Sequence, residues 1–429
     1  MATRITPERI VELEAGGAAA HVADLASLGE QLDRRGIDVE AVIAEVAAFS
    51  VAAPSWAVGT GGTRFGRFPG GGEPRSTEEK LDDVAALNAV TGANRTISLH
   101  VPWDDPADPA ALRIHAEELG LAFDAMNSNT FQDHPSTTGG DVSFKHGSFA
   151  HADPRVRERA LEHNRYVVDL GVALGSTAIT VWLADGTNHP GQADFRRQFE
   201  RVAEGLAELH GHLPDGWTLL TEHKPFEPAS YSTVNADWGT SLLLARAAGP
   251  NARCLVDLGH HLPGTNIEQV VSRLAMVGRL GGFHFNDSKY GDDDLTVGSV
   301  NPYQLFLILL ELVAHGGGAL PPLRYMIDES HNVKDPLEDL AQATDQLQVA
   351  LAQALLVDRA ALAAAQDGND AAGAAEILQA AYRTDVRPIV AEARSRNGAA
   401  RDPLGVLRRS GYRAATAAER GSGLAATGL

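Results

Sequence analysis

The sequence has a single cysteine, Cys254, and no apolar run of 18 residues. One cysteine excludes an internal disulfide. Without a long apolar run there is no candidate transmembrane helix, and the polar, helix-like N-terminus lacks the pattern of a signal peptide. We therefore expect a cytoplasmic protein.

Positive charge is also scarce. The chain has 36 Lys and Arg residues against 56 Asp and Glu residues, which gives a formal net charge of −20 at pH 7. Phosphate binding depends on clustered Lys and Arg, so this balance disfavours nucleic acid or an anionic membrane as a partner.

Several common catalytic motifs are missing. The glycine-rich loop at residues 59–65 lacks the GK[ST] ending of a P-loop, and Arg64 stands where a dinucleotide fingerprint has its third glycine. We find no activated serine or cysteine nucleophile, because Cys254 lies inside an apolar run typical of a core strand. The loop is better interpreted as a flexible cover for an active site, with Phe65 as an apolar wall.

With 429 residues, 44% of them hydrophobic, the chain can bury a large core as one barrel with additions or as two domains. Apolar, β-branched runs alternate with stretches of helical periodicity. The predicted strands are residues 51–58, 96–101, 120–126, 176–183, 217–222, 253–258, 281–286 and 324–328. Eight strands separated by helices favour an α/β fold with a closed parallel (β/α)8 TIM barrel over a doubly wound sheet.

Helical patterns flank this barrel on both sides. We expect N-terminal helices in residues 1–50, the barrel in residues 51–333 and an additional C-terminal helical region in residues 334–415. The small and polar residues of 416–429 predict a disordered tail.

Four consecutive predicted strands carry a potential metal ligand at or near their ends: Glu222, Asp257, His284 and Asp328. We call these four the inner set. A carboxylate at the end of an apolar strand is costly to bury unless it is paired or bound to a cation. Taken alone, each has a simpler explanation, such as a hydrogen-bonded core histidine or a helix cap. Together, three carboxylates and one imidazole predict a site for Mn²⁺, Mg²⁺, Co²⁺ or Zn²⁺.

A second group of ligand-type residues lies further out in the loops. His260 lies three residues past Asp257, and Asp292 and Asp294 are two residues apart, so both can face one point. With Glu222 as a bridge, this outer set predicts a second ion about 4 to 5 Å from the first. The alternative is a solvated acidic turn. Asp293, between the two ligands, is expected to be dispensable.

Aromatic and polar residues are predicted to ring the same barrel mouth: Trp56, His100, Trp103, Trp182 and Lys224. Each tryptophan alone is more simply a core residue. A mouth that combines several tryptophans with His, Lys and carboxylates is, however, what a sugar site needs, because C–H faces stack on rings while hydroxyls take directed hydrogen bonds.

Seven segments strengthen this interpretation: APSWAVGTGGTRFGRFPG, FDAMNSNTF, TEHKPFEPASYSTV, CLVDLGHH, GGFHFNDSKYGDDDL, MIDESHNVKDP and AYRTDVRPI. Together they closely resemble the broad-specificity bacterial L-rhamnose isomerases, which are related to xylose isomerase. The resemblance spans residues 5 to about 415. It implies a (β/α)8 barrel, assembled as a homotetramer, that uses two divalent ions, often Mn²⁺. The implied reaction converts L-rhamnose to L-rhamnulose. It also interconverts other aldose and ketose pairs, such as D-allose and D-allulose.

Residue by residue, the inner and outer sets match the metal ligands of that family. His100, Trp182 and Lys224 match positions that contact substrate, and Phe65 matches an aromatic residue inserted toward a neighbouring subunit. Leu262 and the glycine-rich stretch 316–322 differ and bear on fine specificity.

The sequence leaves the chemistry and some rival functions open. Hydrogen can pass between C1 and C2 as a hydride, or as a proton with Asp328 or Glu222 as base; His260 and Asp292 hold the second ion in either case. The rivals are another sugar isomerase or a ketose 3-epimerase of the same superfamily, a metal-dependent barrel phosphodiesterase or endonuclease, and a sugar- or metal-binding protein without catalysis.

Overall fold

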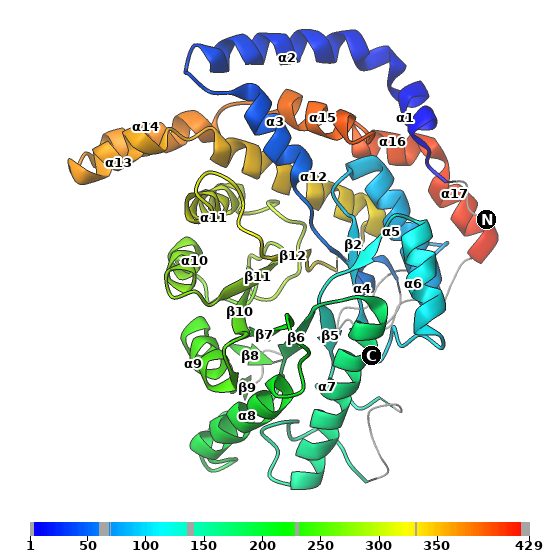
Figure 1. The fold of residues 1–429 in the computed structure, drawn as a ribbon, viewed down its shortest axis with the longest axis vertical. Coiled ribbons are helices and arrows are strands. Elements are labelled where there is room, and N and C mark those ends of the chain that lie inside the picture. Colours follow the sequence, from blue (N-terminus) through cyan, green and yellow to red (C-terminus); the bar gives the residue numbers. More distant parts are fainter. Residues whose placement is uncertain are drawn as a thin grey trace.

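The computed structural model describes residues 4–59, 68, 70–134, 141–227, 231–330 and 333–421. Parallel strands form a barrel at its centre (Figure 1). They are β1 (Ala53–Pro54), β2 (Thr96–Ser98), β3 (His100–Val101), β4 (Ala122–Phe123), β5 (Met126–Ser128), β6 (Ala178–Trp182), β7 (Thr218–Glu222), β10 (Ala252–Asp257), β11 (Leu280–Phe285) and β12 (Arg324–Ile327). Leu99 alone separates β2 from β3, and two residues separate β4 from β5, so each pair forms one interrupted strand.

Backbone hydrogen bonds close the ring of strands. One sheet has the order β12-β11-β10-β7-β6-β5-β3, and a second has the order β1-β2-β4. Ala52 joins them: its N–H donates to the carbonyl of Tyr325 at 2.8 Å, and its carbonyl accepts from the N–H of Ile327 at 3.0 Å. The predicted eight-stranded parallel barrel is thus confirmed.

Helices follow the strands and cover the outside of the barrel (Figure 1). They are α5 (Thr77–Thr91), α6 (Pro109–Glu118), α7 (Pro154–Leu174), α8 (Phe195–His210), α9 (Trp238–Ala248), α10 (Ile267–Met276) and α11 (Pro302–His315). Most begin at an Asp, Asn or Ser whose side chain accepts a backbone N–H of the first turn, as Asp153 does for α7. A short antiparallel hairpin, β8 (Phe226–Glu227) and β9 (Tyr231–Ser232), lies in the loop after β7.

The remaining helices gather along one side of the barrel, at the top of Figure 1. The N-terminal ones are α1 (Pro7–Glu14), η1 (Ala15–Gly17), α2 (Ala18–Asp33) and α3 (Val39–Ala48). The C-terminal ones are α12 (Pro336–Leu355), α13 (Arg359–Asp367), α14 (Ala371–Tyr382), α15 (Arg387–Arg396), α16 (Pro403–Ser410) and α17 (Tyr412–Arg420). In the described part of the chain no single helix is long and apolar enough to span a membrane. The pair α12 and α13 reaches that length and composition only together, and the pair is bent by 64°.

Three predicted boundaries differ from the structure. The first strand ends at Pro54, which has no N–H to donate to a strand ladder, and residues Ser55–Val58 form the helical turn α4. α12 packs between α11 and α5 as the eighth barrel helix, so the barrel continues beyond residue 333. The predicted disordered tail also begins too early, since α17 continues to Arg420; residues 422–429 lie outside the described part.

Apolar residues fill the barrel below the strand ends. Ala125, Ala178, Leu220 and Leu255 form a separate buried cluster inside the ring. The register between β10 and β11 shifts near Gly281, where an added Cβ would lie 2.5 Å from the Leu220 side chain. Glycine is therefore required at this bulge. The filled interior leaves the carboxyl ends of the strands as the place for a polar site.

Candidate metal centre

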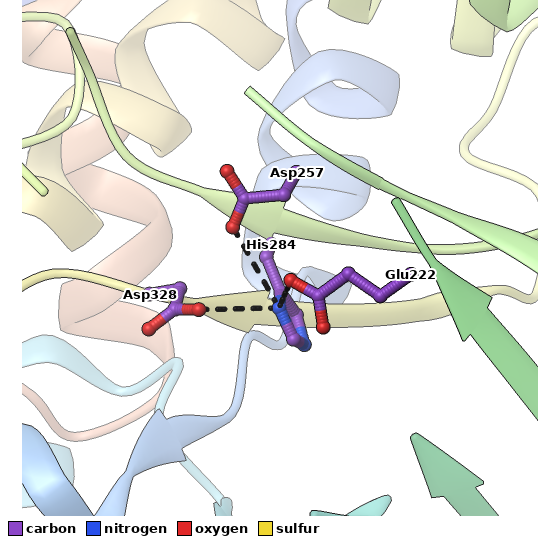
Figure 2. A group of neighbouring side chains, drawn as sticks. All are labelled: Glu222, Asp257, His284 and Asp328. Carbon is purple, nitrogen blue, oxygen red and sulfur yellow. Dashed lines mark hydrogen bonds and ion pairs between the residues drawn. The ribbon is translucent and has the colours of Figure 1, made fainter. Parts of the chain in front are cut away.

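The inner set converges at the carboxyl ends of four neighbouring strands. Glu222 ends β7, Asp257 ends β10, His284 lies near the end of β11 and Asp328 follows β12. One ligand atom from each lies within 4.8 Å of the others. Figure 2 shows the three carboxylates pointing toward the His284 imidazole. The predicted convergence of these four residues is therefore seen in the structure.

The spacing of the inner set fits a divalent ion. His284 Nδ1 lies 3.2 Å from Glu222 Oε1, 3.2 Å from Asp328 Oδ2 and 3.7 Å from Asp257 Oδ2. Neighbouring ligands of an octahedral ion with bonds near 2.1 Å are about 3 Å apart, so little movement is needed to hold one. Three oxygens and one imidazole nitrogen suit Mn²⁺, Mg²⁺, Co²⁺ or Zn²⁺.

The charges of this cluster perturb one another strongly. Burial raises the pKa of Asp257 to about 7, and the neighbouring carboxylates of Asp328 and Glu222 add to the effect. Burial alone would lower the pKa of His284, but Glu222 and Asp328 raise it to about 10. For the carboxyl group of Glu222 burial acts in the opposite direction and would raise the pKa. The two imidazoles of His284 and His260 nevertheless hold the pKa of Glu222 below its usual value. Concentrated negative charge of this kind attracts a cation.

The outer set adjoins the inner one through Glu222. His260 Nδ1 lies 3.2 Å from Glu222 Oε1, and its Nε2 lies 3.2 Å from Asp292 Oδ1. Lys224 Nζ donates to Asp292 Oδ2 at 2.5 Å. Asp294 lines the same cavity. Its pKa is raised well above the usual value by burial and then by the Asp292 carboxylate.

The side chain of Asp293 makes hydrogen bonds within its own turn. Its Oδ2 accepts the backbone N–H groups of Lys289 at 2.6 Å and Tyr290 at 2.7 Å, so it stabilises the turn that carries the outer ligands. Whether activity depends on it stays a prediction.

A cavity with about 640 Å³ of free space, including space open to solvent, lies above the two sets. Its aromatic wall is continuous: the ring centroids of Trp56 and His100 are 5.4 Å apart, those of His100 and Phe131 are 5.9 Å apart, and those of Phe131 and Trp182 are 4.2 Å apart. Lys224 Nζ lies 5.2 Å from the Trp182 ring centroid. The Trp56 indole also donates to Asp328 Oδ1 at 2.9 Å, which links the wall to the inner set.

One predicted wall residue, Trp103, lies outside the cavity lining. Trp103 packs behind His100, with ring centroids 5.1 Å apart, and does not line the described cavity, because the loop after β3 turns its indole toward His134. Phe65 lies outside the described residues.

Several further residues that the sequence patterns did not indicate line the cavity: Asn127, Ser128, Phe131 and Thr180. Thr180 and Trp182 are two apart on β6 and so share a face, a period-two signal that identifies Thr180 from sequence. Asn127 and Ser128 end β5. A search for polar residues at every strand end would have found them.

Several known proteins resemble this chain. The family model for the xylose isomerase-like TIM barrel matches residues 85–311. Proteins named as probable sugar isomerases, from Mesorhizobium japonicum and Rhizobium meliloti, are 55% and 54% identical over 400 residues, and both alignments cover 92% of each chain. A xylose isomerase of Thermus thermophilus is 28% identical over 285 residues, which cover 61% of this chain and 68% of that protein.

Solved structures agree on the fold. An L-ribulose 3-epimerase aligns with a TM-score of 0.52 at 17% identity and covers 71% of this chain and 95% of its own. A D-psicose 3-epimerase aligns with a TM-score of 0.50 at 13% identity and covers 71% and 97%. The family model matches more than half of this chain, and two relatives are more than 50% identical to it. Together with the barrel fold, these matches show that this chain belongs to the xylose isomerase-like TIM barrel family.

Proposed function

We propose that the protein is a metal-dependent aldose–ketose isomerase that converts L-rhamnose to L-rhamnulose and accepts related pairs such as D-allose and D-allulose. The observation that carries this proposal is the joint placement of the inner and outer sets below an aromatic-walled cavity. The relatives named as probable sugar isomerases support the reaction class. The preference for L-rhamnose rests on the sequence resemblance described above.

The inner set would hold one divalent ion, and the outer set a second, with Glu222 shared between them. When bound, such ions polarise the sugar carbonyl and lower the pKa of a hydroxyl or water. We propose Mn²⁺ as the ion, with Co²⁺, Mg²⁺ or Zn²⁺ as substitutes.

The chain's own residues bind and orient the sugar. The wall of Trp56, Phe131 and Trp182 presents ring faces to the C–H surface of a sugar and excludes water from the reacting carbons. His100, in the middle of that wall, offers a ring nitrogen to a sugar hydroxyl. Lys224, fixed against Asp292 at 2.5 Å, places a positive charge beside the developing alkoxide.

Aldose–ketose conversion moves one hydrogen between C1 and C2 and one proton between O2 and O1. Glu222 or Asp328 serves as the base if the carbon-bound hydrogen moves as a proton, and neither is needed for a direct hydride shift. Turnover in D₂O distinguishes the routes. Little deuterium in the product indicates a hydride shift, whereas substantial incorporation indicates proton transfer through an enediol.

The deciding experiment supplies EDTA-treated protein with MnCl₂ and L-rhamnose, D-allulose or L-mannose, and identifies the products. We expect L-rhamnulose from L-rhamnose, and no product when His284→Ala replaces the wild type. Epimerised ketose alone would identify an epimerase instead. Absence of product from every sugar, despite sugar binding, would refute the proposal in favour of a binding protein.

We also propose a homotetramer, in line with the sequence resemblance. Sedimentation velocity of the full chain measures the assembled mass. A monomer at micromolar concentration would contradict this part of the proposal.

A further inference from the structure

Each aspartate of the inner set has one oxygen held by a protein donor and the other turned toward the centre. For Asp328, the Trp56 indole donates to Oδ1, and Oδ2 lies 3.2 Å from His284 Nδ1. For Asp257, Asn286 Nδ2 donates to Oδ1 at 3.0 Å, and the backbone N–H of Gly259 donates to the same atom at 2.8 Å. Neither sequence patterns nor the resemblance indicated a role for Asn286.

The other oxygen of Asp257 is left for the centre. Oδ2 is buried and has no hydrogen-bond partner among the described residues, and it lies 3.7 Å from His284 Nδ1. The terminal torsion of an aspartate is soft, so the carboxylate turns freely unless it is held. Two donors on Oδ1 therefore fix the plane of the carboxylate, with Oδ2 directed at the cluster.

The fold explains how Asn286 reaches its partner. Asn286 follows β11 and lies two residues after His284, so both side chains emerge on the same face. In the parallel pair β10 and β11, His284 stands opposite Asp257, which brings the next inward residue of β11 to the far side of that carboxylate.

The close approach depends on Gly259. An added Cβ there would lie 3.1 Å from Asn286 Oδ1 and 3.4 Å from Asp257 Oδ1. The amide orientation is also determined, since a flipped amide would place its oxygen against a carboxylate oxygen. Asn286 is 2% exposed, so water does not replace it readily as a donor.

We propose that Asn286 is a positioning residue that turns Oδ2 of Asp257 toward the inner ion and so sets the affinity of that site. This rests on the metal centre of the proposed function. A partner that orients a metal ligand typically changes metal affinity 10- to 100-fold when it is removed.

Two substitutions test the role with the full-length protein. Asn286→Ala removes the donor and leaves a space, whereas Asn286→Leu removes the donor but keeps a side chain of similar branched shape. Asn164→Ala is the matched control: Asn164 in α7 is fully buried, its Nδ2 donates to the Ala160 carbonyl at 2.8 Å, and its Oδ1 has no partner in the described part of the chain. Thermal unfolding in EDTA shows whether each variant folds without metal.

The measurement is Mn²⁺ binding, followed by the EPR signal of the free ion during titration. We expect the dissociation constant of one bound ion to rise 10- to 100-fold in Asn286→Ala and Asn286→Leu. We expect the control to bind as the wild type does. Wild-type affinity in either Asn286 variant would overturn the positioning role while leaving the proposed function intact. A wild-type protein that binds no Mn²⁺ would overturn both.

Discussion

A buried ion pair beside the barrel mouth gives a sharp test of how the rim is held. Lys80 on α5 is 3% exposed and Asp104 is 1% exposed, and their Nζ and Oδ1 atoms are 2.5 Å apart. The second oxygen of Asp104 accepts the backbone N–H of His100 at 2.8 Å and also the Ser55 hydroxyl. One carboxylate thus links α5 to two strand ends of the rim.

The perturbation is Lys80→Met, which keeps most of the side-chain length and removes its charge. Asp104 then stays buried without this cation, which costs about 3 to 5 kcal/mol of unfolding free energy. His100 and the residue after Ser55, Trp56, both line the cavity, so a relaxed rim should also raise KM more than it lowers kcat.

Urea unfolding at pH 7 measures the stability, and initial rates with the proposed substrate L-rhamnose and the proposed ion Mn²⁺ measure KM. The double variant Lys80→Met/Asp104→Asn is expected to be more stable than the sum of the single losses predicts, with a coupling of about 1 to 3 kcal/mol. If the unfolding free energy of Lys80→Met lies within about 0.5 kcal/mol of the wild-type value, the ion pair does not hold the rim and the reasoning fails.

Three further predictions concern the outer set, the turn at Asp293 and the buried Asp83. His260→Ala should bind one Mn²⁺ per chain instead of two, by EPR titration, and lose about 100-fold in kcat with unchanged circular dichroism. Asp293→Asn should keep its activity and lie within about 0.5 kcal/mol of the wild-type stability, because an amide oxygen still accepts the two backbone N–H groups; loss of activity would place Asp293 in the site. Burial raises the pKa of Asp83 to about 6 from 3.8, although Arg420 opposes this. The folded protein therefore holds that proton more tightly than the unfolded chain, and stability falls as pH rises from about 4 to 6. Asp83→Asn should remove about 3 kcal/mol of this fall between pH 4 and pH 7 in urea unfolding, and an unchanged fall would contradict it.

Most of the barrel is predictable because its signals are local. Alternating apolar runs and helical periods reveal all eight strands, and the residues at their carboxyl ends meet by topology. The first predicted strand is too long because apolar residues continue on both sides of Pro54 and Ser55, and a hydrophobic run alone does not show that extension stops at the proline. α12 was separated from the barrel because helical periodicity does not show which helices a helix contacts.

The residues of the candidate site also differ in how well the sequence predicts them. The inner set was predictable, since each member sits at or beside a strand end and parallel strands bring those ends together. Trp103 was misplaced because a residue beyond a strand end depends on its loop. Lys80 and Asp104 are not predictable because their roles come from contacts between distant segments, which no period in the sequence records. The spacing of Asn286 from His284 predicts its face of the sheet but not its hydrogen bond to Asp257.

The two sets also differ in what holds them. The ladder of β7, β10 and β11 fixes the backbone at Glu222, Asp257 and His284, so only side-chain torsions remain to be set there, by donors such as Asn286. Asp292 and Asp294 have no such ladder. Their loop is closed by two backbone hydrogen bonds of 2.9 Å between Asp287 and Leu295, while Lys224 and His260 hold Asp292 itself. The outer site therefore depends on loop contacts that open more easily than a sheet, and the inner site is the more rigid half of the centre.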